Sequence, residues 1–283
     1  MLVASGLSPA MASTSVHIAQ LGTTGLSGLA HYRHGTVDTT AAIGLAPAGA
    51  AGAFVGATLL SLLPVAAAKP VSSGLLFALG VYVLCRFFFC SGMCVSRTGS
   101  PAHGFLAALG LVGGFVDATG GGGWGPVATS GLLADGRLTP QRAIGTVSAS
   151  EFAVTVAAVG GFVASRLLLP PLGLLAADDH AGGGGSGPGA LMRVDIVLAL
   201  LLGGLLAAPI APHLVSTLEP RLLGVVVGGF VCATNLRGLL KAAGASPAGF
   251  LWAYVLLIGV WAAAVWQTAR ETSTGACRAK QKA

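Results

Sequence analysis

Charged side chains are scarce in this sequence. Only 8% of the 283 residues are Asp, Glu, Lys or Arg, against about 25% in an ordinary soluble domain. So few charges cannot cover the surface of a water-soluble globule, and a disordered chain would be rich in charge and poor in apolar residues. Both classes are excluded. The 54% of hydrophobic residues and the mean hydropathy of +0.83 indicate an all-α, polytopic membrane protein.

The motifs of soluble enzymes are missing as well. There is no HExxH, no GxSxG and no Walker GxxxxGK[ST] sequence, so we expect no enzyme activity and no cofactor. The five cysteines form no CxxC pair and lie mostly in or beside apolar runs, so we interpret them as small apolar residues rather than metal ligands. The net charge is +6, but the basic residues lie between apolar runs and are not interleaved with aromatic residues. This pattern indicates loops anchored at a lipid bilayer and no nucleic-acid partner.

Eight apolar segments account for most of the chain, and about 20 apolar residues suffice to cross a bilayer. They cover roughly residues 10–31, 40–63, 71–90, 104–133, 143–168, 194–215, 221–241 and 248–267. We expect seven or eight membrane segments in a single membrane domain over 1–267, joined at turn residues such as Lys69-Pro70. The glycine-rich stretch 176–193 predicts a flexible extramembrane loop, and residues 268–283 predict a polar, basic tail.

The segment 104–133 is interrupted in its middle by Gly120–Gly123 and Pro126. Glycine and proline weaken a helix, and freed backbone groups at membrane depth are tolerated only inside protein or beside a wet cavity. The 15 basic residues divide 8 to 7 across the membrane if this segment crosses once, and 10 to 5 if it is a re-entrant hairpin. The positive-inside rule favours the uneven division, and therefore the hairpin.

The chain also contains an internal repeat. A shift of 131 residues places the polar stripe His17, Gln20 and Thr24 on Ser148, Glu151 and Thr155. Later, at a different offset because the loop lengths differ, Gly80, Tyr82 and Val83 match Gly228, Phe230 and Val231. We interpret these matches as a first repeat over 1–90, a second over 104–241 and an extra helix at 248–267. The hairpin makes the repeats inverted, an arrangement common in transporters. The first repeat lacks a counterpart of the broken segment, so we expect an N-terminally shortened chain.

An unwound backbone followed by a half-helix offers free N–H groups and a positive dipole end, which suit an anion. We therefore expect substrate-binding groups at Gly121, Gly122, Gly123, Trp124 and Gly125, hydroxyls from Thr129, Ser130, Thr146 and Ser148, and His17 in the same cavity. The alternative is close helix packing through small residues. Trp124 either forms a wall of the site or lies at an interface. Arg142 either attracts anions or anchors its helix at the headgroups.

Two acidic residues lie within apolar segments, where ionisable groups are expensive and are functional candidates by default. Glu151 is a candidate for proton coupling or gating, and its alternative is a hydrogen-bonded packing role. Asp117 is a second candidate for gating, and its alternative is to cap the half-helix that follows the glycine break.

The motif GFVDATGGGGWGP (114–126), followed by TPQRAIGTVSASEF (139–152), resembles the second-half signature of the TauE/SafE family of sulfite exporters. Residues 9–17 and 27–38 resemble its first half, and 207–209 and 234–237 its late helices, so the resemblance covers about residues 6–267. It implies a permease for sulfur-containing anions in a bacterial cytoplasmic membrane. The first glycine-rich segment is absent, and Gln20 stands where an acid is expected by analogy with Glu151.

The resulting hypothesis is a secondary transporter that moves small anions such as sulfite or organosulfonates, coupled to protons through Glu151. Its expected partners are the small anionic substrate and the lipid bilayer, and the sequence is compatible with an oligomer. The alternatives are a non-transporting membrane scaffold or partner subunit, and an inactive, shortened fragment. A membrane enzyme ranks third, because no nucleophile–base pair or metal site accompanies the apolar segments.

Overall fold

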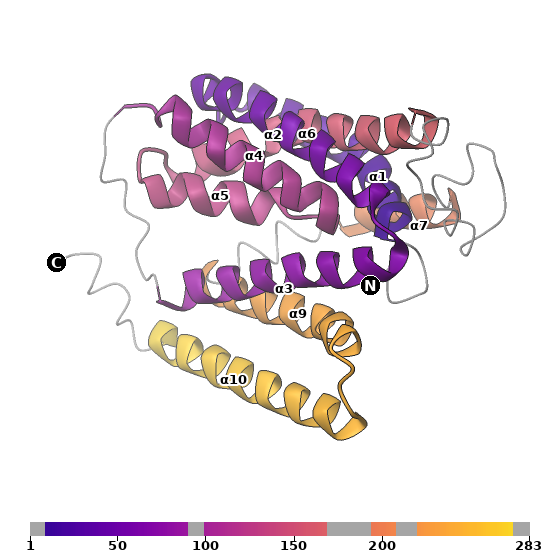
Figure 1. Ribbon diagram of the computed structural model, residues 1–283. Helices are drawn as coiled ribbons and strands as arrows, with labels where there is room; N and C mark the ends of the chain where they lie inside the picture. Colours follow the sequence, from indigo (N-terminus) through magenta and orange to yellow (C-terminus); the bar gives the residue numbers. More distant parts are fainter. Residues whose placement is uncertain (1–8, 90–98, 169–193, 208–219, 274–283) are drawn as a thin grey trace. The chain divides into compact units, whose positions relative to one another are not determined.

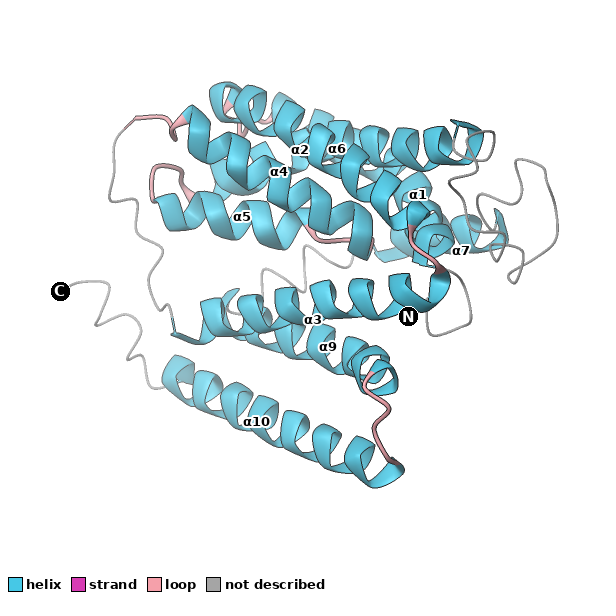
Figure 2. Ribbon diagram, in the orientation of Figure 1, coloured by secondary structure: helices cyan, strands magenta, loops and turns pink. Residues whose placement is uncertain are grey.

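The computed structural model describes residues 9–89, 99–168, 194–207 and 220–273, and every regular element in these ranges is an α-helix (Figures 1 and 2). The helices are α1 (Pro9–Arg33), α2 (Thr39–Leu62), α3 (Val65–Phe89), α4 (His103–Gly120), α5 (Trp124–Asp135), α6 (Pro140–Leu168), α7 (Val194–Ala207), α9 (Pro220–Ala242) and α10 (Pro247–Ser273). The expected all-α class is confirmed for this part of the chain. The predicted loop 176–193 and the segment end 208–215 lie outside the described residues.

Five of the described helices are long and apolar enough to cross a membrane. They are α2, α3, α6, α9 and α10, with spans Thr39–Leu62, Ala66–Phe89, Gln141–Leu168, Arg221–Ala242 and Pro247–Glu271. α7 is apolar but shorter. α1 is long, but its many hydroxyl and amide side chains lower its hydropathy, and the glycine break shortens α4 and α5. The structure therefore supports a multi-pass membrane protein.

Two predicted boundaries are wrong. The turn expected at Lys69-Pro70 is absent, because α2 ends earlier, at Leu62. Its C-cap Leu63 has an extended backbone (φ −76°, ψ 134°), which is the conformation that a following proline, Pro64, favours. Pro70 lies inside α3, near its beginning. At the other end, α10 continues beyond residue 267 to Ser273, and residues 274–283 of the expected tail lie outside the described residues.

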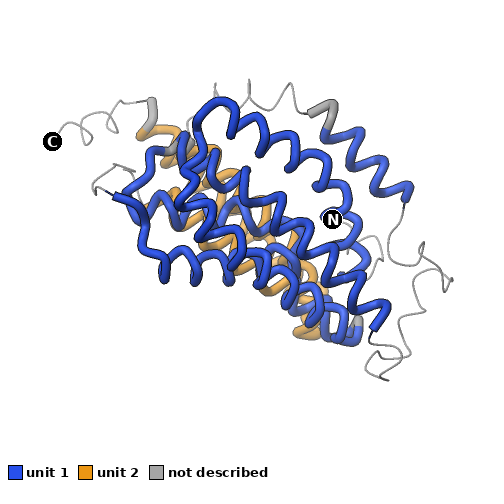
Figure 3. Tube along the Cα trace, turned by 90° about the horizontal axis from the view of Figure 1, so that it is seen from above, with its two compact units in different colours: residues 1–72, 95–204 blue, residues 73–94, 205–283 orange. Residues whose placement is uncertain are grey.

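The chain divides into two compact units, coloured separately in Figure 3. Unit 1 contains residues 1–72 and 95–204, and therefore α1, α2, α4, α5, α6 and most of α7. Unit 2 contains residues 73–94 and 205–283, and therefore most of α3 together with α9 and α10.

In unit 1, glycines bring α2 close to its neighbours α4 and α6. A methyl group on Gly110 of α4 would lie 2.7 Å from the carbonyl oxygen of Leu45, and one on Gly161 of α6 would lie 2.8 Å from that of Phe54. Such close approach is typical of helices packed in membranes, where dispersion replaces the hydrophobic effect. α2 begins at an N-cap, Asp38, whose carboxylate accepts a hydrogen bond from the Ala41 amide at 2.9 Å.

In unit 2, α3 and α9 pack antiparallel through two glycines that make equivalent contacts. A methyl group on Gly80 would lie 2.9 Å from the Cys232 amide nitrogen, and one on Gly228 would lie 2.6 Å from the Leu84 amide nitrogen. Each glycine also faces the other's carbonyl oxygen at 3.0 Å from that methyl position. Substituting either glycine would therefore force the two helices apart.

Hydrogen bonds from side chains to backbone oxygens hold α10 to this pair. The Trp261 indole donates to the Val225 carbonyl at 3.1 Å. Arg221 of α9 donates to the carbonyls of Phe87 and Phe88 in α3, at 3.1 and 2.6 Å, and forms an ion pair with Glu271 of α10. One guanidinium thus joins all three helices of unit 2.

Candidate functional site

The glycine run forms a break between two short helices of unit 1. α4 ends at Gly120, and Gly121 and Gly122 follow with φ of 76° and 153°, values that favour glycine. α5 begins at Trp124, with Gly123 as its N-cap. The break that the sequence predicts in segment 104–133 is confirmed.

The chain turns back at this break, so that α4 and α5 form a hairpin (Figure 1). A methyl group on Gly113 would lie 3.3 Å from the Trp124 ring, near the start of α5. Gly131, further along α5, faces Leu109, which precedes Gly113 in α4. The paired contacts run in opposite directions, as antiparallel helices require. α5 has 12 residues and is too short to cross a bilayer by itself.

Asp117 caps the second helix of the hairpin. Its Oδ1 accepts hydrogen bonds from the backbone amides of Gly123 at 2.7 Å and Trp124 at 3.0 Å. A carboxylate at this position also complements the positive end of the α5 dipole. Two of the amides that the sequence assigned to a bound anion are therefore occupied by an acidic side chain of the same hairpin. The amides of Gly122 and Gly125 donate no hydrogen bond within the described residues.

His17 connects Asp117 to the first helix. Its Nε2 lies 3.0 Å from Asp117 Oδ2, across 100 residues of sequence, and both side chains are almost completely buried. His17 Nδ1 lies 2.8 Å from the Ser13 carbonyl oxygen. A carbonyl only accepts, so Nδ1 carries a proton, and a second proton then lies between Nε2 and the carboxylate. The pair therefore holds a proton in the interior of unit 1.

Further groups from α1, α4 and α6 surround this pair. The Ser13 hydroxyl donates to the Ala118 carbonyl at 2.5 Å, which joins α1 to α4. The Phe162 ring of α6 lies 6.3 Å from the His17 ring, centre to centre. Glu151, half-buried on α6, is close enough to interact electrostatically with both His17 and Asp117. The structure therefore gathers the three ionisable residues that the sequence singled out, from three different helices.

Two polar atoms of the same region have no hydrogen-bond partner within the described residues. They are Oε1 of Gln20 on α1 and Oγ1 of Thr155 on α6, and both are buried. α1 and α6 pack antiparallel, since Gly25 contacts Phe152 and Gly28 contacts Ala149. A buried polar atom without a partner is costly, which favours a polar solute or water beside it.

Trp124 and Thr146 lie inside the packing between helices. Trp124 is fully buried, its indole donates to the Val147 carbonyl at 3.1 Å, and its ring fills the space left by Gly49 on α2. Thr146 is also fully buried, and its hydroxyl accepts a hydrogen bond from the Asp38 amide at 2.9 Å. Trp124 therefore positions the hairpin against α2 and α6, and Thr146 positions the beginning of α2 against α6.

The remaining expected residues differ in exposure. Thr129 and Ser148 are half-buried, and Ser130 is buried. Arg142 is exposed and lies near the beginning of α6, 3.7 Å from the Asp38 carboxylate. Within the described residues, no group of three or more His, Cys, Asp or Glu side chains could hold a metal ion.

Known proteins resemble this chain in sequence. The family model described as "Sulfite exporter TauE/SafE" matches residues 1–238. The chain is 40% identical over 266 residues to the probable membrane transporter protein YtnM of Bacillus subtilis (strain 168), covering 94% of this chain and 82% of that protein. No solved structure matches. The chain therefore belongs to the sulfite exporter TauE/SafE family of membrane transporters.

Proposed function

We propose that this protein is a secondary transporter that moves small sulfur-containing anions, such as sulfite or organosulfonates, across a bacterial cytoplasmic membrane. The observation that carries the proposal is the glycine break, where backbone amides meet the buried pair His17–Asp117. A half-helix N-terminus inside a polar region is suited to a small anion. The family's printed description names sulfite as its cargo.

The solute contacts are assigned to the amides of Gly122 and Gly125 and to the hydroxyls of Thr129 and Ser148. Gly125 and Thr129 are one turn apart on α5 and so share a face of that helix. Gly121, Gly123, Trp124, Thr146 and His17 act around them by holding the hairpin and its neighbours in place.

Proton coupling is assigned to Glu151 together with the His17–Asp117 pair. A proton lies between His17 and Asp117, and the Glu151 carboxyl interacts with both. An anion that enters this region changes the electrostatic cost of keeping that proton. Movement of the anion and of a proton would thereby be linked.

The architecture that we propose adds membrane segments to the five apolar spans. α1, the α4–α5 hairpin and α7 complete a total of seven or eight, and the two repeats are inverted. Inversion is supported inside unit 2. The shift that places Gly80 on Gly228 also places Leu84 on Cys232, so it turns the contact between Gly80 and Cys232 into the contact between Gly228 and Leu84. Inside unit 1, the matched helices α1 and α6 pack antiparallel.

The decisive experiment is flux of radiolabelled sulfite, and in parallel of an organosulfonate, into proteoliposomes that contain the full chain. We expect saturable uptake that chloride at equal concentration does not inhibit. Absence of flux for every sulfur anion tested, from correctly inserted protein, would instead support the non-transporting scaffold.

Gly125→Leu tests the site at the break. A side chain at Gly125 meets nothing within 4 Å, so the variant is expected to fold, and its leucine would cover the exposed amides. We expect sulfite flux to fall at least tenfold. Gly160→Leu on α6, which also meets nothing within 4 Å, is the matched control and should retain flux. Equal flux in both variants would show that the solute does not bind at the glycine break.

Glu151→Gln tests the coupling. The amide keeps the shape of the side chain but cannot carry a proton on and off. We expect the dependence of sulfite flux on pH to flatten, while flux at the optimum changes less. Asp135→Asn, which alters an acid paired with Arg137 at the far end of α5, is the control. An unchanged pH profile in Glu151→Gln would eliminate this residue from coupling.

A further inference from the structure

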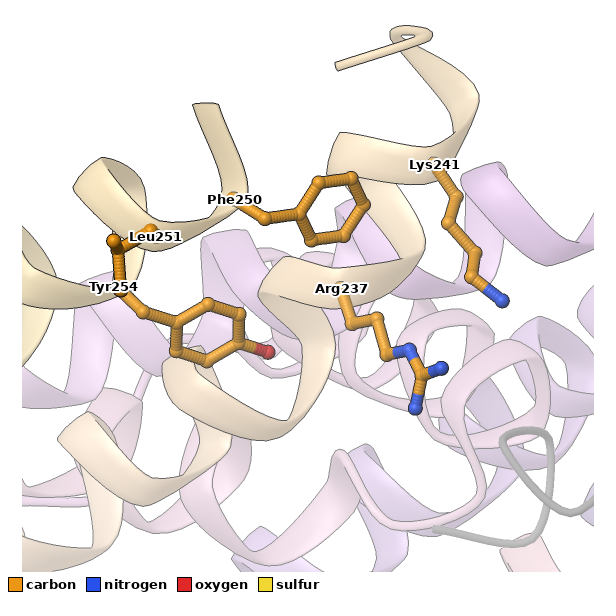
Figure 4. A pocket seen from close by; sticks show the side chains of 5 residues that line it. All are labelled: Arg237, Lys241, Phe250, Leu251 and Tyr254. Carbon is orange, nitrogen blue, oxygen red and sulfur yellow. The ribbon is translucent and has the colours of Figure 1, made fainter. Parts of the chain in front are cut away.

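A hollow lies between the end of α9 and the beginning of α10, within unit 2 (Figure 4). Arg237 and Lys241 line it from α9, and Phe250, Leu251 and Tyr254 line it from α10. The two cations are four residues apart, so they lie on one face of α9. The lining therefore combines two positive charges with apolar and aromatic surface, and none of its described residues is acidic.

The two cations are unpaired. Within the described residues, neither the Arg237 nor the Lys241 side chain has an ion-pair or hydrogen-bond partner, and both residues are exposed. Arg221, near the opposite end of α9, instead has a carboxylate partner in Glu271. Cations near a helix C-terminus are favoured by the dipole, but that effect needs neither a hollow nor an aromatic wall. The two positive charges at this site therefore favour an anionic ligand.

The aromatic wall is held in position. The Tyr254 hydroxyl donates to the Ala233 carbonyl of α9 at 3.1 Å, which fixes the tyrosine ring across the two helices. Phe250 lies one turn earlier on α10 and extends towards α9 in Figure 4. Both rings are half-buried, and so they form a stable side of the hollow.

Beyond the hollow, α10 presents a long apolar face. Leu251, Val255 and Leu256 are 63%, 52% and 70% exposed, and α10 is one of the apolar spans. A ligand that fits both features has an anionic head at Arg237 and Lys241 and hydrocarbon that continues along α10. A small free anion would use the first feature only.

We propose that this hollow binds the headgroup of an anionic phospholipid, with its phosphate on Arg237 and Lys241 and its acyl chains along Leu251 and Val255. Arginine and lysine are the usual donors to lipid phosphates at the membrane surface. The cations lie at the end of a membrane span, which is the depth of the headgroups. This site shares no residue with the glycine break and does not depend on the proposed transport function.

Native mass spectrometry of the full chain, titrated with phosphatidylglycerol or phosphatidylcholine, tests the site. We expect one phosphatidylglycerol to bind preferentially to the wild-type protein. Each basic residue near an anionic lipid contributes about fivefold in affinity, so Arg237→Ala with Lys241→Ala should weaken that binding on the order of 30-fold. Arg33→Ala with Lys69→Ala, which removes the same charge from other helix ends, should leave it unchanged.

Three results would overturn the proposal. They are equal binding of both lipids to the wild-type protein, equal losses in the two double variants, and displacement of the lipid by millimolar glycerol phosphate, which would make the hollow a site for a free anion. If the alanine pair does not fold, Arg237→Gln with Lys241→Gln keeps the side-chain length and replaces it in the same comparison.

Discussion

The two units hold their helices together by different means. Unit 1 buries many polar side chains, among them His17, Asp117 and Thr155, and uses them to join helices that are distant in sequence. Unit 2 relies on glycine contacts between α3 and α9 and on donors that reach backbone oxygens, such as Trp261. Polar groups within apolar helices cost free energy, and proteins keep them where they serve a function. Under the proposed function, this contrast places the solute and the proton in unit 1 and leaves unit 2 a supporting role.

The largest effect is expected from Asp117→Ala. The substitution leaves His17 without its partner and the amides of Gly123 and Trp124 without an acceptor. Removing one member of a buried ion pair costs about 3–5 kcal/mol. We expect a much lower thermal midpoint in detergent and loss of sulfite flux.

The control for this variant is Asp135→Ala, at the other end of α5, where the Arg137 side chain is 24% and the Asp135 side chain 8% exposed. Asp135 makes a single ion pair to a partly exposed partner two residues away, so its loss should lower the thermal midpoint less than the loss of Asp117. Similar midpoints for both variants would show that the polar cluster of unit 1 is no more critical than this local pair, and the contrast between the units would fail.

A smaller effect is expected from Gly228→Val in unit 2. The added side chain would collide with the Leu84 backbone, and overpacking costs about 1–3 kcal/mol. Gly259→Val on α10, where a side chain meets nothing within 4 Å, should be close to neutral. Thermal midpoints of the two variants give the comparison. If unit 2 is only support, Gly228→Val lowers stability but leaves the substrate concentration at half-maximal flux unchanged.

The smallest effects on stability are expected from two threonine substitutions on α6. Thr146→Val removes the acceptor of the Asp38 amide and should cost about 1 kcal/mol. Thr155→Val removes a hydroxyl that has no partner within the described residues, so stability should stay equal or rise slightly. Flux should respond in the opposite order, with the larger loss in Thr155→Val. A larger flux loss in Thr146→Val would argue against a contact between the Thr155 hydroxyl and the solute.

Most helices could be predicted from the sequence because their apolar runs are long. The break in segment 104–133 was equally visible, since four consecutive glycines rarely serve another purpose within an apolar run. The wrong turn at Pro70 has a simple reason. Two prolines lie six residues apart, and either could end a helix, but only Pro64 is preceded by a residue that the structure holds extended.

The contacts of the candidate site could be predicted only in part. His17, Asp117 and Glu151 were recognisable one by one as polar residues in apolar segments. Their meeting was not, because hydrophobic periodicity gives the face of a helix but not its neighbour, and 100 residues separate His17 from Asp117. The burial of Trp124 escaped for the same reason, since it depends on the glycine opposite it on α2.

The carboxylate that caps α5 has a consequence for how strongly any cargo can be held. Asp117 is tethered a few residues from the amides it occupies, so its effective concentration there is high and never falls. Under the proposed function, a diffusing anion finds these two amides closed and meets only those of Gly122 and Gly125. Fewer donors mean weaker binding and faster release, which suits a carrier that has to unload on the far side.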